Sequence, residues 1–422
     1  MKYNMNILNK TLDNSLHVIL IQKPDYVKSL FMLGVPAGGF DVVQKNQDEI
    51  VKHSSGCAHF LEHQMFRLNQ RDVTQDFAKM QAQTNAFTSY TETAYYFQTT
   101  SDIEKPLALL LDFVENLDID QQSVEKEKGI ILSEYNMYEQ NPEQRLLMNT
   151  WRALYHKHPL KIDILGNKDD ISNMTPETLT QFYQMNYDPS RLTLVGVTGK
   201  DINKIMDFVI EHQKGVASKI QGDIARIMPE EPKEVVLKES IECMDITMPY
   251  VCVAYKLNPV DTIMDAMRLD IALQMRIDSL FGPLNPEYQT WMDEQIISQV
   301  AFAECDFNVD HGYVIFVAQT YKVQEFIDLV DKLVKKIKEP IDPFIYHALS
   351  TKLISQNIRS LDSFDSLAIE MMRAHFENYD YLKSLELVKE MDPSVIEDLC
   401  SHLDFSYRSI IEILPNESKS SK

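Results

Sequence analysis

GCAHFLEHQMF, at residues 56–66, is the stretch of this 422-residue sequence on which its interpretation depends. His59 and His63 are four positions apart, and residues at i and i+4 lie on the same face of an α-helix. Both imidazoles can therefore bind one metal ion, and Zn2+ accepts imidazole nitrogen readily. Glu62 stands beside the second histidine, where a carboxylate can act as a general base toward water. The stretch predicts a catalytic metal site built on a helix.

The surrounding pattern predicts that this helix covers residues 54–68, with Ser54 or Ser55 as its N-cap. One alternative stays open, because two histidines can fall at this spacing by chance in a surface or core helix. Cys57 is near enough in sequence to be mistaken for a ligand, but we interpret it as a packed thiol.

A third ligand has to come from elsewhere, because a catalytic zinc site takes three protein ligands and leaves one position open. Residues 121–140 predict a strong helix, and it carries four glutamates: Glu125, Glu127, Glu134 and Glu139. Glu127 and Glu134 are seven positions apart and share a face. One of them can bind the metal while another orients a histidine ligand, but spacing alone does not say which.

Strand and helix patterns are mixed in both halves of the chain, which predicts an α+β fold in which one kind of unit is used twice. Strands are expected at residues 17–22, 29–36, 85–99, 191–199, 250–257, 300–305 and 312–320, and further helices at residues 104–116, 176–185, 260–281 and 326–337. Periodicity is lost near residues 213–233, where two prolines occur. We therefore expect an N-terminal domain at 1–215, a linker at 216–233, a C-terminal domain at 234–422, and a disordered tail ESKSSK.

Composition excludes several classes of partner. The formal net charge of −22 opposes binding to nucleic acid and to anionic lipid. No apolar run approaches the roughly 20 residues that a membrane-spanning helix needs, and the start of the chain has no secretory pattern. The five cysteines are an odd number without C-x-x-C spacing, which indicates reduced thiols and a cytoplasmic location.

Four segments that occur in order carry a resemblance to a known family. They are GCAHFLEHQMF (56–66), TNAFTSYTETAYYF (84–97), VEKEKGIILSEYNMYEQNP (124–142) and HPLKIDILGNKDDISNMTPETLTQFYQMNYDPSRLTLVGVTG (158–199). Together they resemble the pitrilysin, insulysin and mitochondrial-processing-peptidase family of zinc metallopeptidases with the inverted H-x-x-E-H motif, and its short bacterial two-domain branch in particular. The resemblance implies two homologous two-layer α/β sandwich domains that enclose a chamber.

The resemblance also assigns residues to roles. It implies one Zn2+ per chain, bound by His59, His63 and Glu134, with Glu62 as the general base. Glu127 falls on the carboxylate that orients a ligand.

Asn85 and Ala86 fall on the family's strand that holds the backbone of a peptide substrate, which is consistent with strand addition to a sheet edge. The alternative for Asn85 is an ordinary turn residue at the start of a strand.

The second half departs from the family pattern. Self-sufficient members supply an arginine and, seven residues later, a tyrosine, but the matching segment 288–302 has Met292 and Gln299. Neither side chain offers a guanidinium or a phenol. The resemblance therefore implies a heterodimer with a homologous, zinc-free subunit that supplies both groups.

The sequence thus predicts a cytoplasmic zinc endopeptidase that acts on peptides. One alternative is a non-catalytic scaffold or assembly subunit of a peptidase-like complex, and another is a zinc enzyme that hydrolyses non-peptide substrates.

Overall fold

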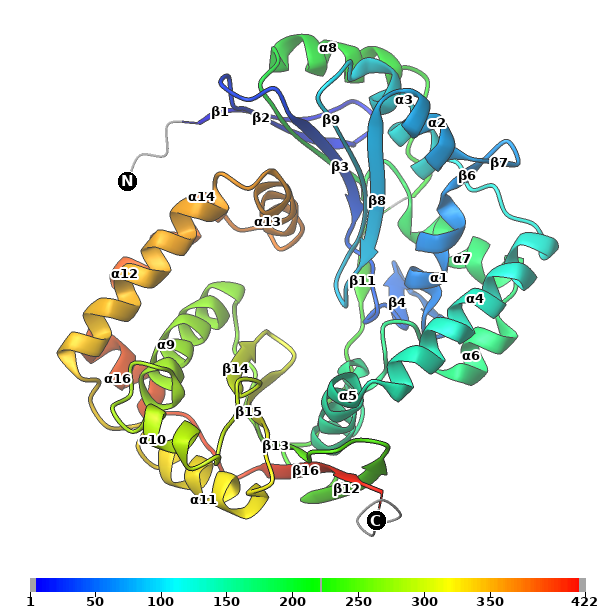
Figure 1. The fold of residues 1–422 in the computed structure, drawn as a ribbon. Helices are drawn as coiled ribbons and strands as arrows, with labels where there is room; N and C mark the ends of the chain where they lie inside the picture. The colour runs from blue at the N-terminus through cyan, green and yellow to red at the C-terminus, as the bar shows by residue number, and fades with distance from the viewer. Residues whose placement is uncertain (1–4, 221, 417–422) are drawn as a thin grey trace. The chain divides into compact units, whose positions relative to one another are not determined.

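The computed structural model describes residues 5–220 and 222–416, and the chain divides into two compact units (Figure 1). Unit 1 comprises residues 1–136, 162–227 and 359–381, and unit 2 comprises residues 137–161, 228–358 and 382–422. The change from one unit to the other at Ile227 falls inside the segment 216–233 that the sequence marks as a linker. The predicted disordered tail lies outside the described residues.

Unit 1 is built on a six-stranded sheet in the order β1-β2-β10-β3-β9-β8. Its strands are β1 (Asn6–Thr11), β2 (His17–Gln22), β3 (Ser29–Val35), β8 (Ala82–Thr88), β9 (Thr93–Thr99) and β10 (Thr193–Thr198). Among the described residues β8 pairs only with β9, so β8 is an edge strand. Short strands form two further ladders, namely β4 (Val43–Asn46) with β5 (Glu49–Lys52) and β11 (Ile224–Arg226), and β6 (Arg67–Leu68) with β7 (Arg71–Asp72).

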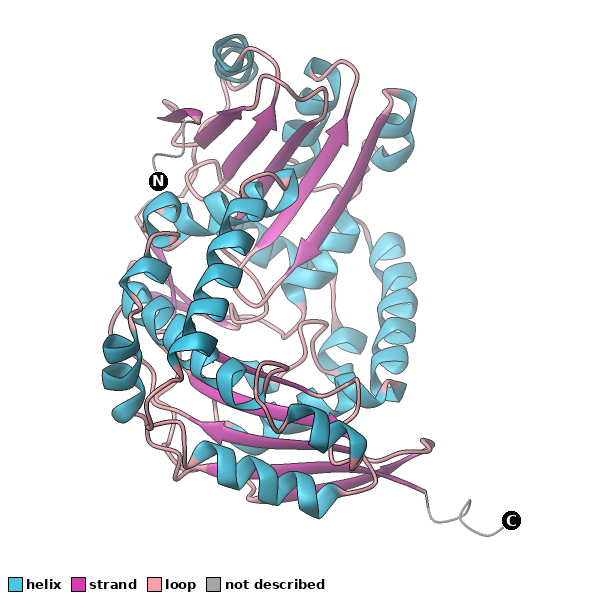
Figure 2. Ribbon diagram, turned by 60° about the vertical axis from the view of Figure 1, so that its left-hand side comes forward, coloured by secondary structure: helices cyan, strands magenta, loops and turns pink. Residues whose placement is uncertain are grey.

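Helices cover one face of this sheet and form a buried core with it (Figure 2). They include α1 (Cys57–Met65), α2 (Val73–Lys79), α3 (Glu104–Val114), α7 (Pro176–Asn186) and α8 (Ile202–His212). Core side chains alternate along the strands, as in Phe31 and Leu33 of β3 and Tyr95 and Phe97 of β9, because successive residues of a strand point to opposite faces. Two further helices, α4 (Gln121–Gln140) and α6 (Lys168–Asn173), lie next to α1.

Unit 2 has a five-stranded sheet in the order β12-β16-β13-β15-β14. Its strands are β12 (Glu239–Met244), β13 (Tyr250–Lys256), β14 (Phe302–Phe307), β15 (Gly312–Gln319) and β16 (Arg408–Pro415). The remaining elements are α5 (Pro142–Leu154), η1 (Pro159–Lys161), α9 (Ile263–Phe281), α10 (Tyr288–Asp293), α11 (Val323–Val334), α12 (Pro343–Ser360), α14 (Tyr381–Ser384), α15 (Leu387–Glu390) and α16 (Pro393–Ser401).

The two sheets repeat one topology. In unit 1, β2 runs parallel to β10, and antiparallel pairs then follow through β3 and β9 to β8. In unit 2, β12 runs parallel to β16, and antiparallel pairs follow through β13 and β15 to β14. The prediction of one α+β unit used twice is therefore confirmed at the level of strand order and direction.

Each sheet has its second face covered by a helix from the opposite half of the chain. In unit 1 this helix is α13 (Phe364–Phe376), which packs on β3 and β10. A Cβ atom at Gly34 of β3 would lie 2.1 Å from Met372 Sδ of α13, so the glycine permits this close approach. In unit 2, α5 covers β13 and β16. The compact units differ from the expected 1–215 and 234–422 division, because the central strands β3, β10 and β13 are buried along their whole length and need covering on both faces.

Most predicted elements occur near their expected bounds, and 121–140 coincides with α4. The predicted helix 54–68 is shorter in the structure, because α1 ends at Met65 and Arg67 enters the short strand β6. No described helix is both long and apolar enough to cross a membrane.

Candidate metal centre

The start of α1 is fixed by the close approach of the backbone at two glycines, Gly56 and Gly166. Gly56 has a φ of 80° and Gly166 a φ of 89°, values that disfavour residues with a side chain. A Cβ atom at Gly56 would lie 2.2 Å from the carbonyl oxygen of Leu165, and one at Gly166 would lie 2.5 Å from that of Ser55. The first turn of the helix is therefore held against the loop that leads into α6.

The predicted N-cap is wrong for a local reason. Gly56 occupies the N-cap position, and no side chain caps the helix. The Ser55 hydroxyl instead donates a hydrogen bond of 2.5 Å to Asp170 Oδ2, and the Ser55 N–H donates to the same oxygen over 2.9 Å. The serine joins α1 to α6 rather than satisfying an N–H group of its own helix.

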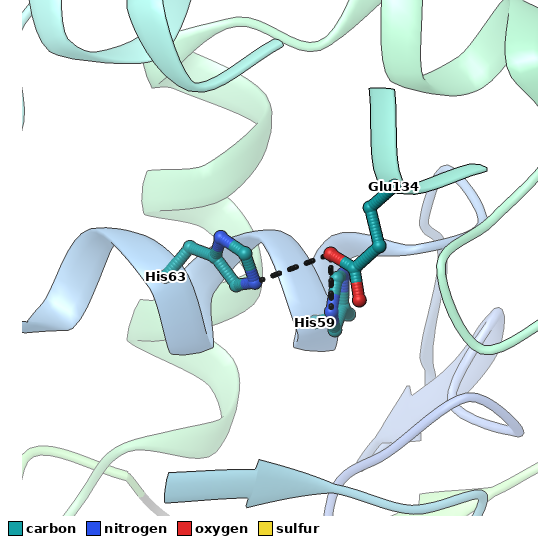
Figure 3. Close-up of side chains that lie close together, drawn as sticks. All are labelled: His59, His63 and Glu134. Carbon is teal, nitrogen blue, oxygen red and sulfur yellow. Dashed lines mark ion pairs between the residues drawn. The ribbon is translucent and has the colours of Figure 1, made fainter. Parts of the chain in front are cut away.

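His59, His63 and Glu134 come together where α1 meets α4 (Figure 3). Glu134 Oε2 lies 3.8 Å from His59 Nε2 and 3.7 Å from His63 Nε2, and the three ligand atoms all lie within 4.8 Å of one another. Ligands about 2.1 Å from a tetrahedral Zn2+ lie about 3.4 Å apart. Two imidazoles and a carboxylate at this spacing fit one zinc ion with small adjustments.

Glu127 is hydrogen-bonded to the second histidine. Its Oε1 lies 2.8 Å from His63 Nδ1, and both side chains are largely buried. Because a carboxylate accepts, the proton of a neutral His63 is held on Nδ1, and the Nε2 lone pair then points toward Glu134. Burial acts to lower the pKa of His63, but the hydrogen bond to Glu127 and the charges of Glu62, Glu127 and Glu134 raise it overall.

His59 is buried in an environment that keeps its ring neutral. Burial, together with the nearby His63, lowers the pKa of His59 to about 3. The neutral ring is the form that binds a metal.

Glu62 projects from α1 toward the edge strand of the sheet. Its Oε2 accepts a hydrogen bond of 2.8 Å from the hydroxyl of Thr88, the last residue of β8. Burial raises the pKa of Glu62, and the Thr88 hydrogen bond opposes that shift. The sequence interpretation did not include Thr88, because no spacing rule connects a strand end to a helix 26 residues away.

Asn85 and Ala86 lie on β8 and outside the group of three ligand atoms. Asn85 is exposed, and its Oδ1 accepts a hydrogen bond of 2.9 Å from the Ala86 N–H. The Asn85 side chain is thus directed to solvent along the free edge of the sheet.

Cys57 is buried, and its Sγ contacts Met174 Sδ at 3.7 Å. Burial raises the pKa of its thiol to about 12, so the sulfur stays protonated. The interpretation of Cys57 as a packed thiol is confirmed.

A second group of potential ligands in unit 2, formed by His158, Asp310 and His311, does not suit a metal. The Leu160 N–H donates to His158 Nδ1 over 3.1 Å, so this ring carries its proton on Nε2 and has no lone pair there for a metal. Both nitrogens of His311 face carboxylates, Asp310 at 2.5 Å and Asp306 at 3.0 Å. This group is a buried hydrogen-bond network around a protonated His311.

Known proteins resemble this chain over both units. Residues 47–168 match the family described as "Insulinase (Peptidase family M16)", and residues 173–352 match "Peptidase M16 inactive domain". An uncharacterized zinc protease of Bacillus subtilis, YmfH, is 28% identical over 396 residues, which are 93% of this chain and 92% of that protein. Mitochondrial-processing peptidase subunit beta of Neurospora crassa is 25% identical over 244 residues, or 57% of this chain and 49% of that subunit.

The fold comparison extends over the whole chain. The crystal structure of an M16-like peptidase from Alicyclobacillus acidocaldarius shares 26% identity, with a TM-score of 0.93 over 99% of this chain and 100% of the other. A protease from Helicobacter pylori has the same fold, with a TM-score of 0.84 at 19% identity over 97% of this chain and 100% of the other. With two adjoining family matches and a shared two-unit fold, this chain belongs to peptidase family M16.

Proposed function

We propose that this chain is a zinc-dependent endopeptidase that binds one Zn2+ through His59, His63 and Glu134. The observation that supports it most is the convergence of these three ligand atoms within 4.8 Å, from two helices far apart in the sequence. The relatives named zinc protease and peptidase support the same reaction class.

In the proposed reaction, residues of the chain activate a water molecule and transfer its proton. A bound Zn2+ would supply Lewis-acid polarisation of the scissile carbonyl. Glu62, one residue from a ligand, removes a proton from the attacking water and transfers it to the departing amine. Its half-buried position supports this role, because a carboxylate with a raised pKa can both accept and return a proton.

The free edge of β8 supports an extended peptide as substrate. An edge strand offers unpaired N–H and C=O groups, to which a peptide can add as a further strand. Asn85 and Ala86 would then contact the substrate backbone, on the same strand whose end reaches Glu62.

We further propose that the active species is a heterodimer with a homologous, zinc-free subunit. Met292 on α10 and Gln299 in the following loop stand where the family resemblance expects arginine and tyrosine. A relative named as a subunit of a processing peptidase supports paired assembly. A mild pull-down from native cells should recover an equimolar homologue without H-x-x-E-H. Repeated recovery of a lone, fully active chain would refute this pairing.

Five free cysteines, three of them buried, fit a reducing cytoplasm as the location.

A non-catalytic scaffold is the competing function. The experiment that separates the two is Glu62→Gln, assayed for zinc content and for peptide cleavage by mass spectrometry. The peptidase proposal predicts full zinc content with cleavage abolished. Unchanged cleavage would refute the role of Glu62, and a wild-type complex with no cleavage would favour the scaffold.

A further inference from the structure

The strand that ends beside the metal centre also holds the general base. Thr88 is the last residue of β8, and its hydroxyl donates to Glu62 Oε2 over 2.8 Å. Among the described residues, this hydrogen bond ties the Glu62 carboxylate to β8, and it restricts rotation of a side chain that has several rotamers.

Thr88 is itself held in place by its neighbours along the chain. It pairs with Thr93 of β9, which is fully buried and whose hydroxyl donates to the carbonyl of Ala37 over 2.8 Å. In the next position, the Ser89 N–H donates to the Glu92 carbonyl, and the Ser89 carbonyl accepts from Gly39 N–H over 3.0 Å. The backbone at the end of β8 is thereby held by hydrogen bonds on both sides, and the Thr88 hydroxyl projects from this fixed strand end to Glu62.

We propose that Thr88 is a positioning residue that fixes the Glu62 carboxylate for proton transfer and sets its place relative to a peptide bound along β8. The inference rests on the proposed peptidase function and deepens it. One strand would then carry both the substrate-binding edge and the hydroxyl that aims the base. The backbone of β8 would then set both the position of the bound peptide and the position of the Glu62 carboxylate. A shift of this strand would move both together.

The test compares Thr88→Val, which keeps the shape but removes the hydroxyl, with Thr88→Ser, which keeps the hydroxyl. In the active complex, we expect Thr88→Val to lower kcat by about 10- to 100-fold with KM within about twofold, because groups that orient reacting residues contribute on this scale. Thr88→Ser should restore most of kcat. Zinc content should match wild type in both variants, since neither touches a ligand.

Thr99→Val is the matched control, because it makes the same change at the opposite end of the β8–β9 hairpin. The Thr99 hydroxyl donates to the Gln81 carbonyl over 2.8 Å and does not reach Glu62. We expect lower stability but unchanged kcat. An equal loss of kcat in Thr99→Val and Thr88→Val would assign the effect to the hairpin's stability and overturn the inference.

A crystal structure of zinc-loaded Thr88→Val gives a readout that does not depend on activity. The Glu62 carboxylate should leave its wild-type position or occupy several. Wild-type kcat or an unmoved Glu62 in Thr88→Val would overturn the positioning role while leaving the peptidase intact. Absence of zinc-dependent cleavage in the wild-type complex would instead overturn the proposed function and this inference together.

Discussion

Replacing Glu127 by alanine should weaken zinc binding without removing any ligand. The carboxylate lies 2.8 Å from His63 Nδ1, with side-chain exposures of 16% for Glu127 and 24% for His63. A hydrogen bond to a charged group is worth about 1.5–3 kcal/mol, and about 1.4 kcal/mol corresponds to a tenfold change in affinity. Because both groups are largely shielded from water, we expect the Kd for Zn2+ to rise about 10- to 100-fold.

The assay is competition with a chromophoric zinc chelator at constant pH. Glu125→Ala is the matched control, because Glu125 is an exposed residue of the same helix that pairs with Lys128 and contacts no histidine of the site. Its Kd should stay within about twofold of wild type. A Glu127→Ala Kd that also stays within twofold would refute the proposal that this carboxylate orients His63.

Two further predictions concern stability. Gly56→Ala should destabilise the protein by about 1–3 kcal/mol, because its φ of 80° strains an L-residue and the new Cβ meets the Leu165 carbonyl at 2.2 Å. Gly129→Ala on α4 has open space around its Cβ and should stabilise by about 0.5–1 kcal/mol; thermal unfolding that gives both variants the same sign would contradict this. The His311 pKa is raised to about 9, since the hydrogen bonds to Asp306 and Asp310 outweigh burial. Because the pKa of His311 is higher in the folded protein, its protonated ring contributes fully to the free energy of unfolding below pH 6.5. This contribution is lost as the pH rises toward 9. Urea unfolding of His311→Gln should therefore depend less on pH across this window than wild type, and equal slopes would refute the assignment.

Local sequence patterns were sufficient to predict helix α1 and most of the strands. The i, i+4 spacing of His59 and His63 put both rings on one face of α1, as the structure has them. The seven-residue spacing of Glu127 and Glu134 put both on one face of α4 but left their roles open. The structure separates them by distance, because Glu127 lies against His63 Nδ1 and Glu134 against the Nε2 atoms of both rings.

Features that depend on distant contacts were not predictable. The exchange of α5 and α13 between the halves arises from sheet faces that need covering, and an amphipathic helix does not specify which sheet it covers. The Thr88 hydroxyl resembles any other threonine at a strand end until β8 is placed beside α1. Ser54 or Ser55 is predicted as the N-cap because serine is strongly preferred at that position, whereas the Ser55 hydroxyl donates to Asp170, 115 residues away.

The zinc content of the purified chain is the decisive measurement for the proposed metal site. We would measure it by elemental analysis after dialysis against zinc-free buffer, on wild type and on His63→Ala. We expect one zinc per wild-type chain and a near-complete loss of zinc in the variant, with folding confirmed by circular dichroism. A wild-type chain without zinc, or a folded His63→Ala that retains one zinc, would contradict the metal centre of His59, His63 and Glu134.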